Sequence, residues 1–243
     1  MTTVSMGRAR HGNSLAWEIV SGVSGLLLAL FMWGHVLLVG SILTGARGFD
    51  WLASMLERYY IAQPTVAVIL TLFLIHAVSA SRKIPARLRE RRAFLALSKD
   101  LRNAGRLGFE PHLDSLLWVW QVRTGLVILV LASFHLVLLA LDVFTPLFGE
   151  RQGIEAATTL ARVSGGLWLP YGILLVCVEF HASVGLYRLA VKWGAGSKLS
   201  RTALYAIEQI LFWLVLVIGL VTLVVLAGIL DPPLAFLLPE AAT

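Results

Sequence analysis

The sequence predicts an all-α integral membrane protein with five transmembrane helices. Hydrophobic residues make up 58% of the 243 positions and charged residues only 14%, whereas a soluble domain carries about 25% charged residues. Apolar stretches also recur along the chain, and several reach the length of about 20 residues that a helix needs to cross a bilayer. No long polar stretch separates them, so we expect one membrane domain over residues 1–243.

Five stretches qualify as transmembrane helices. They cover residues 15–43, 59–80, 116–143, 165–191 and 203–230. The first and third are longer than a bilayer requires, so we expect them to tilt or to protrude. Turn and breaker residues mark the limits of the spans, as in residues 44–48 after the first and Asp231, Pro232 and Pro233 after the fifth.

Positive charge indicates the orientation of the chain. Lysine and arginine gather in the N-terminal segment and in the connections after the second and fourth spans, and residues 82–106 alone contain nine of them. Cationic segments beside a membrane tend to remain cytoplasmic. We therefore predict a cytoplasmic N-terminus and a periplasmic C-terminus.

Residues 82–106 alternate basic and apolar side chains, which fits either an amphipathic helix at the interface or a solvated basic loop. They also form a candidate docking surface for a cytoplasmic partner.

Four of the six histidines lie inside the predicted spans, one in each of the first four. They are His35, His76, His135 and His181. Ionisable side chains are costly inside a membrane and are therefore functional candidates. A single histidine could simply form a hydrogen bond between helices, but the distribution over four helices indicates a shared ligand.

The predicted depths of these histidines form two pairs. His35 and His135 each lie about 20 residues, or about 30 Å, from the cytoplasmic start of their helices. His76 and His181 each lie about 16 residues, or about 24 Å, from the outer start of theirs. The first pair is therefore expected near the outer face, and the second pair nearer the cytoplasm.

Two ligands at each of two depths suit two haem b groups, each held between a pair of axial histidines in a four-helix bundle. A zinc or non-haem iron site would instead gather three or four ligands at one depth. The single cysteine, Cys177, excludes covalent haem attachment and thiolate iron–sulfur clusters.

Polar side chains near the histidines are candidates to bind the haem propionates. Lys83, Arg188 and Lys192 follow the second pair toward the cytoplasm and could neutralise these anions, although cationic residues at helix ends also simply extend to the interface. Ser21 and Ser24 precede His35 at helical spacing, Gln121 shares the face of His135, and Trp118 flanks it, so these four are further cofactor-binding candidates.

Longer motifs surround these residues. They are Leu30-Phe31-Met32-Trp33-Gly34-His35, His76-Ala77 followed by Arg82-Lys83-Ile84-Pro85, Trp118 with Gln121 before His135, and Glu179-Phe180-His181 followed by Gly185-Leu186-Tyr187-Arg188 and Lys192-Trp193-Gly194. Over the five spans the chain resembles the di-haem cytochrome b subunit of succinate dehydrogenase and quinol:fumarate reductase complexes. The resemblance implies a proximal haem between His76 and His181 and a distal haem between His35 and His135. It also implies propionate contacts for Trp118 and Lys192, whereas the family's Gln-Ser pair is Ser21-Gly22 here.

The resemblance further implies a function. Such a subunit relays electrons between menaquinol in the bacterial cytoplasmic membrane and the flavoprotein and iron–sulfur subunits on the cytoplasmic face, within a dimer of heterotrimers. No dicarboxylate site is expected on this chain, and no nucleic-acid partner. The reverse reaction, succinate oxidation, remains open.

Two carboxylates are candidates for proton transfer. Glu179 lies inside a span and, at about 100° per residue, points away from the His181 face. The resemblance suggests that it belongs to a transmembrane proton path, while a hydrogen bond to a neighbouring helix is the alternative. Glu57 lies just before the second span and is a candidate acceptor for quinol protons. The alternative is an ordinary solvated loop carboxylate.

Two other functions fit the pattern less well. The cytochrome b subunits of hydrogenases and formate dehydrogenases also use intramembrane histidines, but typically place more than one ligand on a single helix. A proton transporter with a histidine relay would need no matched ligand depths, and would usually show broken helices or an internal repeat.

Overall fold

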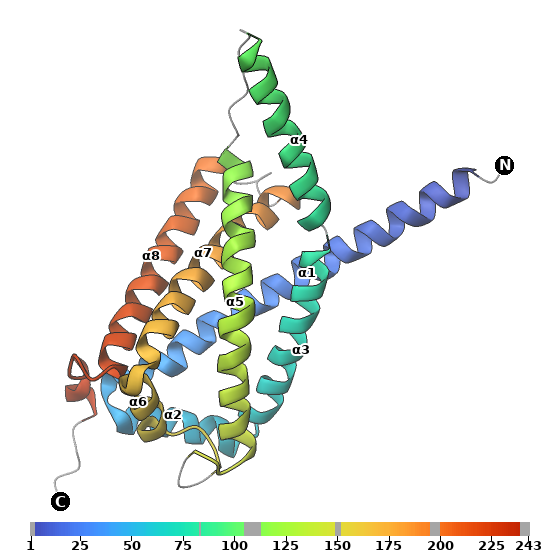
Figure 1. Ribbon diagram of the computed structural model, residues 1–243. Coiled ribbons are helices and arrows are strands. Elements are labelled where there is room, and N and C mark those ends of the chain that lie inside the picture. The colour runs from blue at the N-terminus through green and yellow to red at the C-terminus, as the bar shows by residue number, and fades with distance from the viewer. Residues whose placement is uncertain (1–2, 83, 105–112, 149–151, 195–199, 239–243) are drawn as a thin grey trace, which may run out of the picture.

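The computed structural model describes residues 3–82, 84–104, 113–148, 152–194 and 200–238. Every regular element within these ranges is a helix (Figure 1). The prediction of an all-α protein is therefore confirmed.

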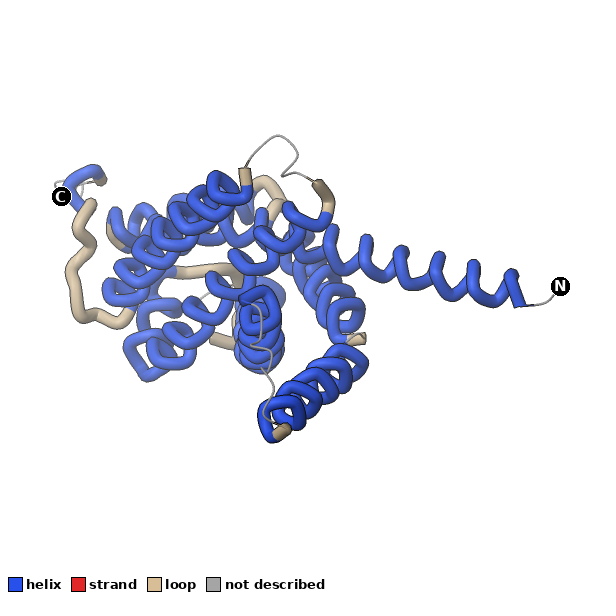
Figure 2. The backbone as a smooth tube through the Cα atoms, turned by 90° about the horizontal axis from the view of Figure 1, so that it is seen from above, coloured by secondary structure: helices blue, strands red, loops and turns tan. Residues whose placement is uncertain are grey.

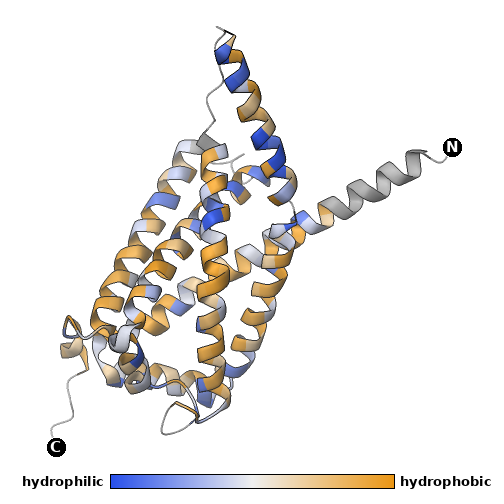
Figure 3. Ribbon diagram, viewed as in Figure 1, coloured by the Kyte–Doolittle hydropathy of each residue, from blue (hydrophilic) through white to orange (hydrophobic). Residues whose placement is uncertain are grey.

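Five long helices form the body of the molecule. They are α1 (Thr3–Gly40), α3 (Ala62–Ser81), α5 (Leu113–Phe144), α7 (Trp168–Lys192) and α8 (Arg201–Leu226). Each lies in a segment long and apolar enough to cross a membrane. Figure 3 shows the hydrophobic colour along all five, with hydrophilic residues gathered mainly toward their ends. The five predicted spans are thus confirmed, with boundaries that differ by a few residues at most ends.

The long helices pack as a ring. α1 packs against α3, α3 against α5, α5 against α7 and α7 against α8, and α8 returns to α1. Seen from above, these helices surround a common centre, while α4 (Ile84–Asn103) and the start of α1 extend away from it (Figure 2). The four helices that carry the intramembrane histidines are therefore consecutive in the ring, and α8 closes it.

The outward faces of the ring are apolar. Leu37, Val130 and Ile210 are 74%, 68% and 67% exposed. A surface with this much exposed apolar area is unusual for a water-soluble monomer. Helices satisfy all their interior backbone hydrogen bonds internally, so these faces can meet lipid without cost to the backbone.

Two short helices cover one end of the ring. α2 (Ala46–Arg58) and α6 (Ala156–Arg162) lie together there, opposite the end from which α4 projects (Figure 1). Phe49 and Ala53 lie one helical turn apart on α2 and are almost fully buried. They join a tightly packed cluster whose other members are Ile42, Ala156, Val163, Val225 and Leu226. The molecule is therefore most tightly packed at this α2–α6 end.

A kink divides the fourth span. A π-helical turn over Val163–Leu167 separates α6 from α7, and Gly166 within it has a φ of 126°. Glycine adopts this left-handed conformation without a steric penalty. The predicted span began at residue 165, inside the kink, because hydropathy does not reveal a change of helix direction.

The basic segment after the second span is helical. α4 runs from Ile84 to Asn103, which favours the helix over the loop interpretation of residues 82–106, although residues 83, 105 and 106 lie outside the described ranges. The guanidinium carbon of Arg82 lies 4.1 Å from the centroid of the Trp17 ring, which ties the end of α3 to α1.

Candidate cofactor site

A cavity of about 740 Å³ lies inside the ring, with residues of all five long helices in its wall. Ligand pockets typically measure about 300–1,000 Å³. At the α4 end the cavity is bounded by residues such as Trp17 and Trp193, and at the α2–α6 end by Asp142 and Arg162. All four intramembrane histidines line it. They are His35, His76, His135 and His181.

The histidines meet in two pairs. The ring centroids of His76 and His181 are 6.3 Å apart, and those of His35 and His135 are 6.0 Å apart. These are the two pairs that the depths in the sequence predict. With metal–nitrogen bonds of about 2 Å, two imidazoles on opposite sides of one metal ion have centroids roughly 6 Å apart. Both pairs therefore have the spacing that axial ligands of one iron require.

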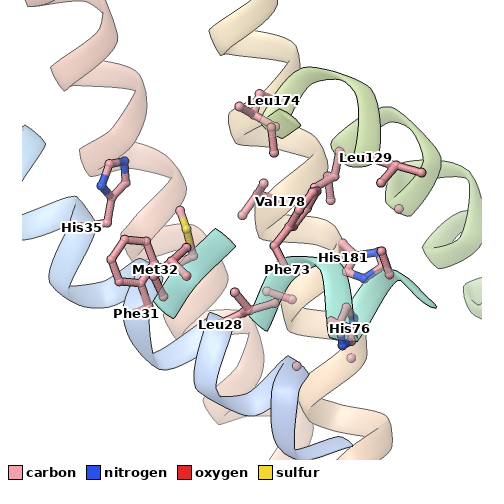
Figure 4. A pocket seen from close by; sticks show the side chains of 18 of the residues that line it. Leu28, Phe31, Met32, His35, Phe73, His76, Leu129, Leu174, Val178 and His181 are labelled. Carbon is pink, nitrogen blue, oxygen red and sulfur yellow. The ribbon is translucent and has the colours of Figure 1, made fainter. Parts of the chain in front are cut away.

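Apolar side chains occupy the space between the two levels. Figure 4 shows His35 toward one side of the pocket, and His76 beside His181 toward the other. Phe31, Met32 and other apolar side chains separate them. An apolar wall with few polar groups suits a large, flat, mostly apolar ligand. Among the described residues, no three side chains of the His, Cys, Asp and Glu types come together as a compact metal site.

In the pair nearer α4, His76 and His181, the Nδ1 atom of each ring has a hydrogen-bond partner. Nδ1 of His76 lies 3.1 Å from the carbonyl oxygen of Ser21, and Nδ1 of His181 lies 2.9 Å from that of Gln121. A carbonyl oxygen only accepts hydrogen bonds, so each Nδ1 carries the proton and donates it. Nε2 is then unprotonated, which is the state that binds a metal.

Two glycines allow these rings to sit against the opposite helices. A Cβ atom on Gly25 would lie 2.8 Å from Cε1 of His76, and one on Gly125 would lie 2.9 Å from Cε1 of His181. Side-chain carbons do not approach so closely. Any larger residue at either position would push the imidazole toward the centre of the cavity, where the cofactor would lie.

Most of the predicted cofactor-binding residues lie in the wall at the α4 end. Ser21, Trp118, Gln121, Arg188 and Lys192 all line the cavity. Arg188 donates to Oε1 of Gln121 over 3.1 Å, and Lys192 forms an ion pair with Glu18 from α1. This end therefore offers cationic and hydrogen-bonding groups that an anionic carboxylate can engage.

Two predicted contacts are placed differently. Ser24 is buried and is not among the described residues that line the cavity. Its hydroxyl oxygen lies 3.2 Å from Nδ1 of His76, on the ring's outer side. Lys83 lies outside the described residues.

A buried ion pair lies at the opposite end. Arg162 pairs with Asp142, which is only 9% exposed, and both line the cavity. The hydroxyl of Tyr171 lies 3.4 Å from Nδ1 of His135. Neither Asp142 nor Arg162 was among the candidates from the sequence. An acid and a base each within a few residues of a predicted helix end could have indicated a pair.

The two candidate proton carriers lie off the cavity. Oε1 of Glu57, on α2, accepts a hydrogen bond of 2.6 Å from the amide of Ile154, a residue that does line the cavity. Glu179 is 6% exposed. Its neighbours Val178 and His181 line the cavity, but among the described lining residues Glu179 does not occur. Its side chain therefore lies beside the cavity wall.

The chain is similar in sequence to one known protein family and to several named proteins. Residues 98–225 match the family described as succinate dehydrogenase/fumarate reductase transmembrane subunit. The chain is 33% identical over 228 residues to the fumarate reductase cytochrome b subunit of Wolinella succinogenes, with 88% of this chain and 82% of that protein covered. It is 30% identical over 227 residues to the proteins of the same name from two strains of Helicobacter pylori, with 90% of this chain and 82% of those proteins covered.

Proposed function

Because this chain belongs to the family of succinate dehydrogenase/fumarate reductase transmembrane subunits, we propose that it is the di-haem cytochrome b subunit of a quinol:fumarate reductase. The observation that carries the proposal is the cavity whose wall presents two facing pairs of histidines, 6.0 and 6.3 Å apart. Electrons pass through this cavity between menaquinol and the soluble subunits.

Four histidines would hold two haem b groups: His76 and His181 the proximal one, and His35 and His135 the distal one. Haem iron would supply reversible one-electron transfer. The protein fixes the orientation of the imidazoles through their Nδ1 partners and excludes water with the apolar side chains between the two levels.

Charged and polar side chains at both ends receive the propionates. At the α4 end, Trp118, Gln121, Arg188 and Lys192 serve the proximal haem, with Ser21 and Lys83 as further contacts. At the α2–α6 end, Arg162 lies in the cavity wall and serves the distal haem. Its two terminal nitrogens already bond the carboxylate of Asp142, and a guanidinium has further N–H donors for a propionate.

Quinol oxidation releases protons, which need an acceptor close to the quinone. Glu57 fills this role on the distal side, because its carboxylate binds the backbone of Ile154, a residue of the cavity wall. Glu179 carries protons within the membrane. Its burial next to the cavity supports this role, since a carboxylate held away from water can exchange a proton only with internal groups or internal water.

The α4 end of the molecule faces the cytoplasm and binds the partner subunits. The N-terminus lies in the cytoplasm and the C-terminus in the periplasm of a bacterial inner membrane, as the positive charge of α4 supports. A flavoprotein and an iron–sulfur subunit bind at the α4 end, and the fumarate site is on the flavoprotein. The complex is a dimer of heterotrimers.

The test uses the purified complex with two electron donors. One is a menaquinol analogue, and the other is a reduced water-soluble dye that delivers electrons directly to the soluble subunits. H76A and H35A should each abolish fumarate reduction with the quinol and retain it with the dye. T71V serves as the control, because Thr71 on α3 is exposed and its hydroxyl bonds only its own helix. Full quinol activity in H76A would refute the relay.

A further inference from the structure

The surroundings of His76 and His181 repeat one another. Nδ1 of His76 faces the Ser21 carbonyl oxygen at 3.1 Å and the Ser24 hydroxyl at 3.2 Å. Nδ1 of His181 faces the Gln121 carbonyl oxygen at 2.9 Å and the Thr124 hydroxyl at 3.5 Å. In both cases the carbonyl lies four positions before the glycine that contacts the ring, and the hydroxyl lies one position before it.

This recurrence follows from helix geometry. Residues four apart lie on the same side of a helix, one turn from each other, so the glycine and the carbonyl face the same neighbour. The imidazole ring packs against the glycine, and its Nδ1 donates to the carbonyl oxygen one turn before that glycine. The hydroxyl just before the glycine then lies beside the same nitrogen. α1 and α5, which lie apart in the ring of helices, thus present equivalent sites to the two proximal ligands.

The hydroxyls act as acceptors in these contacts. Ser24 donates its proton to the carbonyl oxygen of Val20 over 2.7 Å, and Thr124 donates its proton to that of Trp120 over 2.9 Å. A hydroxyl has one proton and two lone pairs, so each oxygen has lone pairs left for the imidazole N–H. Each Nδ1–H is therefore shared between a carbonyl oxygen and a hydroxyl oxygen.

We propose that Ser24 and Thr124 are positioning residues that make His76 and His181 stronger electron donors to the proximal iron. Acceptors on Nδ1–H raise the basicity of the ligating imidazole. A more basic ligand favours ferric over ferrous iron, so the two hydroxyls lower the reduction potential of the proximal haem. This inference rests on the proposed function, since it requires haem to be bound at this level.

Among the described residues, this pairing of a carbonyl oxygen with a hydroxyl at Nδ1 occurs only at His76 and His181. Nδ1 of His135 faces the phenol of Tyr171 at 3.4 Å. Within the described part of the chain, the structure gives neither His35 nor His135 a backbone carbonyl partner for its ring. Removing Ser24 or Thr124 should therefore affect the proximal haem alone, which separates a specific electronic effect from a general loosening of the bundle.

The experiment is a potentiometric titration of haem absorbance in the purified complex, for the wild type and four variants. S24A and T124V remove a hydroxyl, T124S retains it, and T71V removes a comparable back-bonded hydroxyl on α3 that contacts no ring. The haem that is absent from H76A identifies the proximal component. We expect its midpoint potential to rise in S24A and T124V, and to stay at the wild-type value in T124S and T71V. The distal midpoint should be the same in all of them.

The outcomes separate this inference from the proposed function. Two haems with an unshifted proximal midpoint in both S24A and T124V would overturn the role of the hydroxyls and leave the relay intact. Absence of haem from the wild-type chain would refute the proposed function itself. If T124V loses its proximal haem, S24A decides: a raised midpoint there supports the inference, and an unchanged one overturns it.

Discussion

Gly25 of α1 lies directly against the ring of His76 on α3, so closely that an added Cβ atom would come within 2.8 Å of Cε1. The same relationship holds between Gly125 and His181, at 2.9 Å. The imidazoles are thus positioned by the absence of a side chain on the opposite helix as well as by hydrogen bonds.

The variants G25A and G125A should each lose the proximal haem and retain the distal one, because the added methyl group displaces a proximal ligand. Gly34 provides a matched control on α1, since a Cβ there meets nothing within 4 Å. Haem content per chain, together with helix content by circular dichroism, measures the effect. Equal haem content in G25A and G34A would contradict the account.

Glu57 and Asp50 on α2 provide a comparison between a proton acceptor and a structural carboxylate. Both accept backbone amide protons at the start of α6: Glu57 from Ile154, two residues before the helix, over 2.6 Å, and Asp50 from Ala156, its first residue, over 2.7 Å. We expect E57Q to reduce quinol oxidation strongly at unchanged haem content, and D50N to leave the quinol rate near that of the wild type. A similar loss in both variants would indicate that the hydrogen bonds to the loop matter, and that proton transfer by Glu57 does not.

The ion pair between Asp142 and Arg162 should contribute strongly to stability. Removing one partner of a buried pair typically costs about 3–5 kcal/mol, because the other charge is left without compensation. R162M should therefore lower the thermal unfolding midpoint in detergent, and R162M/D142L should recover part of the loss.

An exposed ion pair serves as the control for this measurement. Lys192 pairs with Glu18, and their side chains are 54% and 28% exposed. Pairs of this kind contribute about 0–1 kcal/mol, so E18Q should shift the midpoint only slightly. Equal shifts in E18Q and R162M would show that burial of the Asp142 pair has no special effect.

Glu179 is expected to carry protons without contacting haem. E179Q preserves the size of the side chain but cannot exchange a proton. It should retain both haems, lose fumarate reduction driven by the menaquinol analogue, and keep the dye-driven activity. E208Q, at a glutamate on α8 that bonds its neighbour Gln209, should behave as the wild type. Undiminished quinol activity in E179Q would exclude the proton path.

The membrane architecture could be predicted because lipid imposes the same requirement on every turn of a spanning helix. Each span is a continuous apolar run, and hydropathy alone locates it. The histidine pairs were also predictable, since the position of a residue along a straight helix gives its depth. His35 meets His135, and His76 meets His181, for this reason.

Contacts between residues distant in sequence were not predictable. Nothing in the sequence distinguishes Gly25, where an added Cβ would meet the ring of His76, from Gly34, where it would meet nothing within 4 Å. Ser24 was expected to face the cofactor. It lies instead behind His76, because the direction of a side chain depends on how each helix is rotated in the bundle.

The short helices α2 and α6 were also missed. Their sequences lack a long apolar run, and they are stabilised by packing that only the complete fold provides, such as the buried cluster that includes Phe49, Ala156 and Val163. The amide partner of Glu57 depends on the same folded connection. Local patterns carry little information about such segments, because most of their stability comes from tertiary packing.

The central claim is that two haem b groups are held by two specific pairs of histidines. Pyridine haemochrome quantitation with reduced-minus-oxidised spectra tests it most directly, on the wild type and on H35A, H76A, H135A and H181A. We predict two haems per wild-type chain, with loss of one spectral component in H35A and H135A and of the other in H76A and H181A. A wild-type chain with an intact helical fold and no haem would contradict the claim, as would variants whose losses do not follow these pairs.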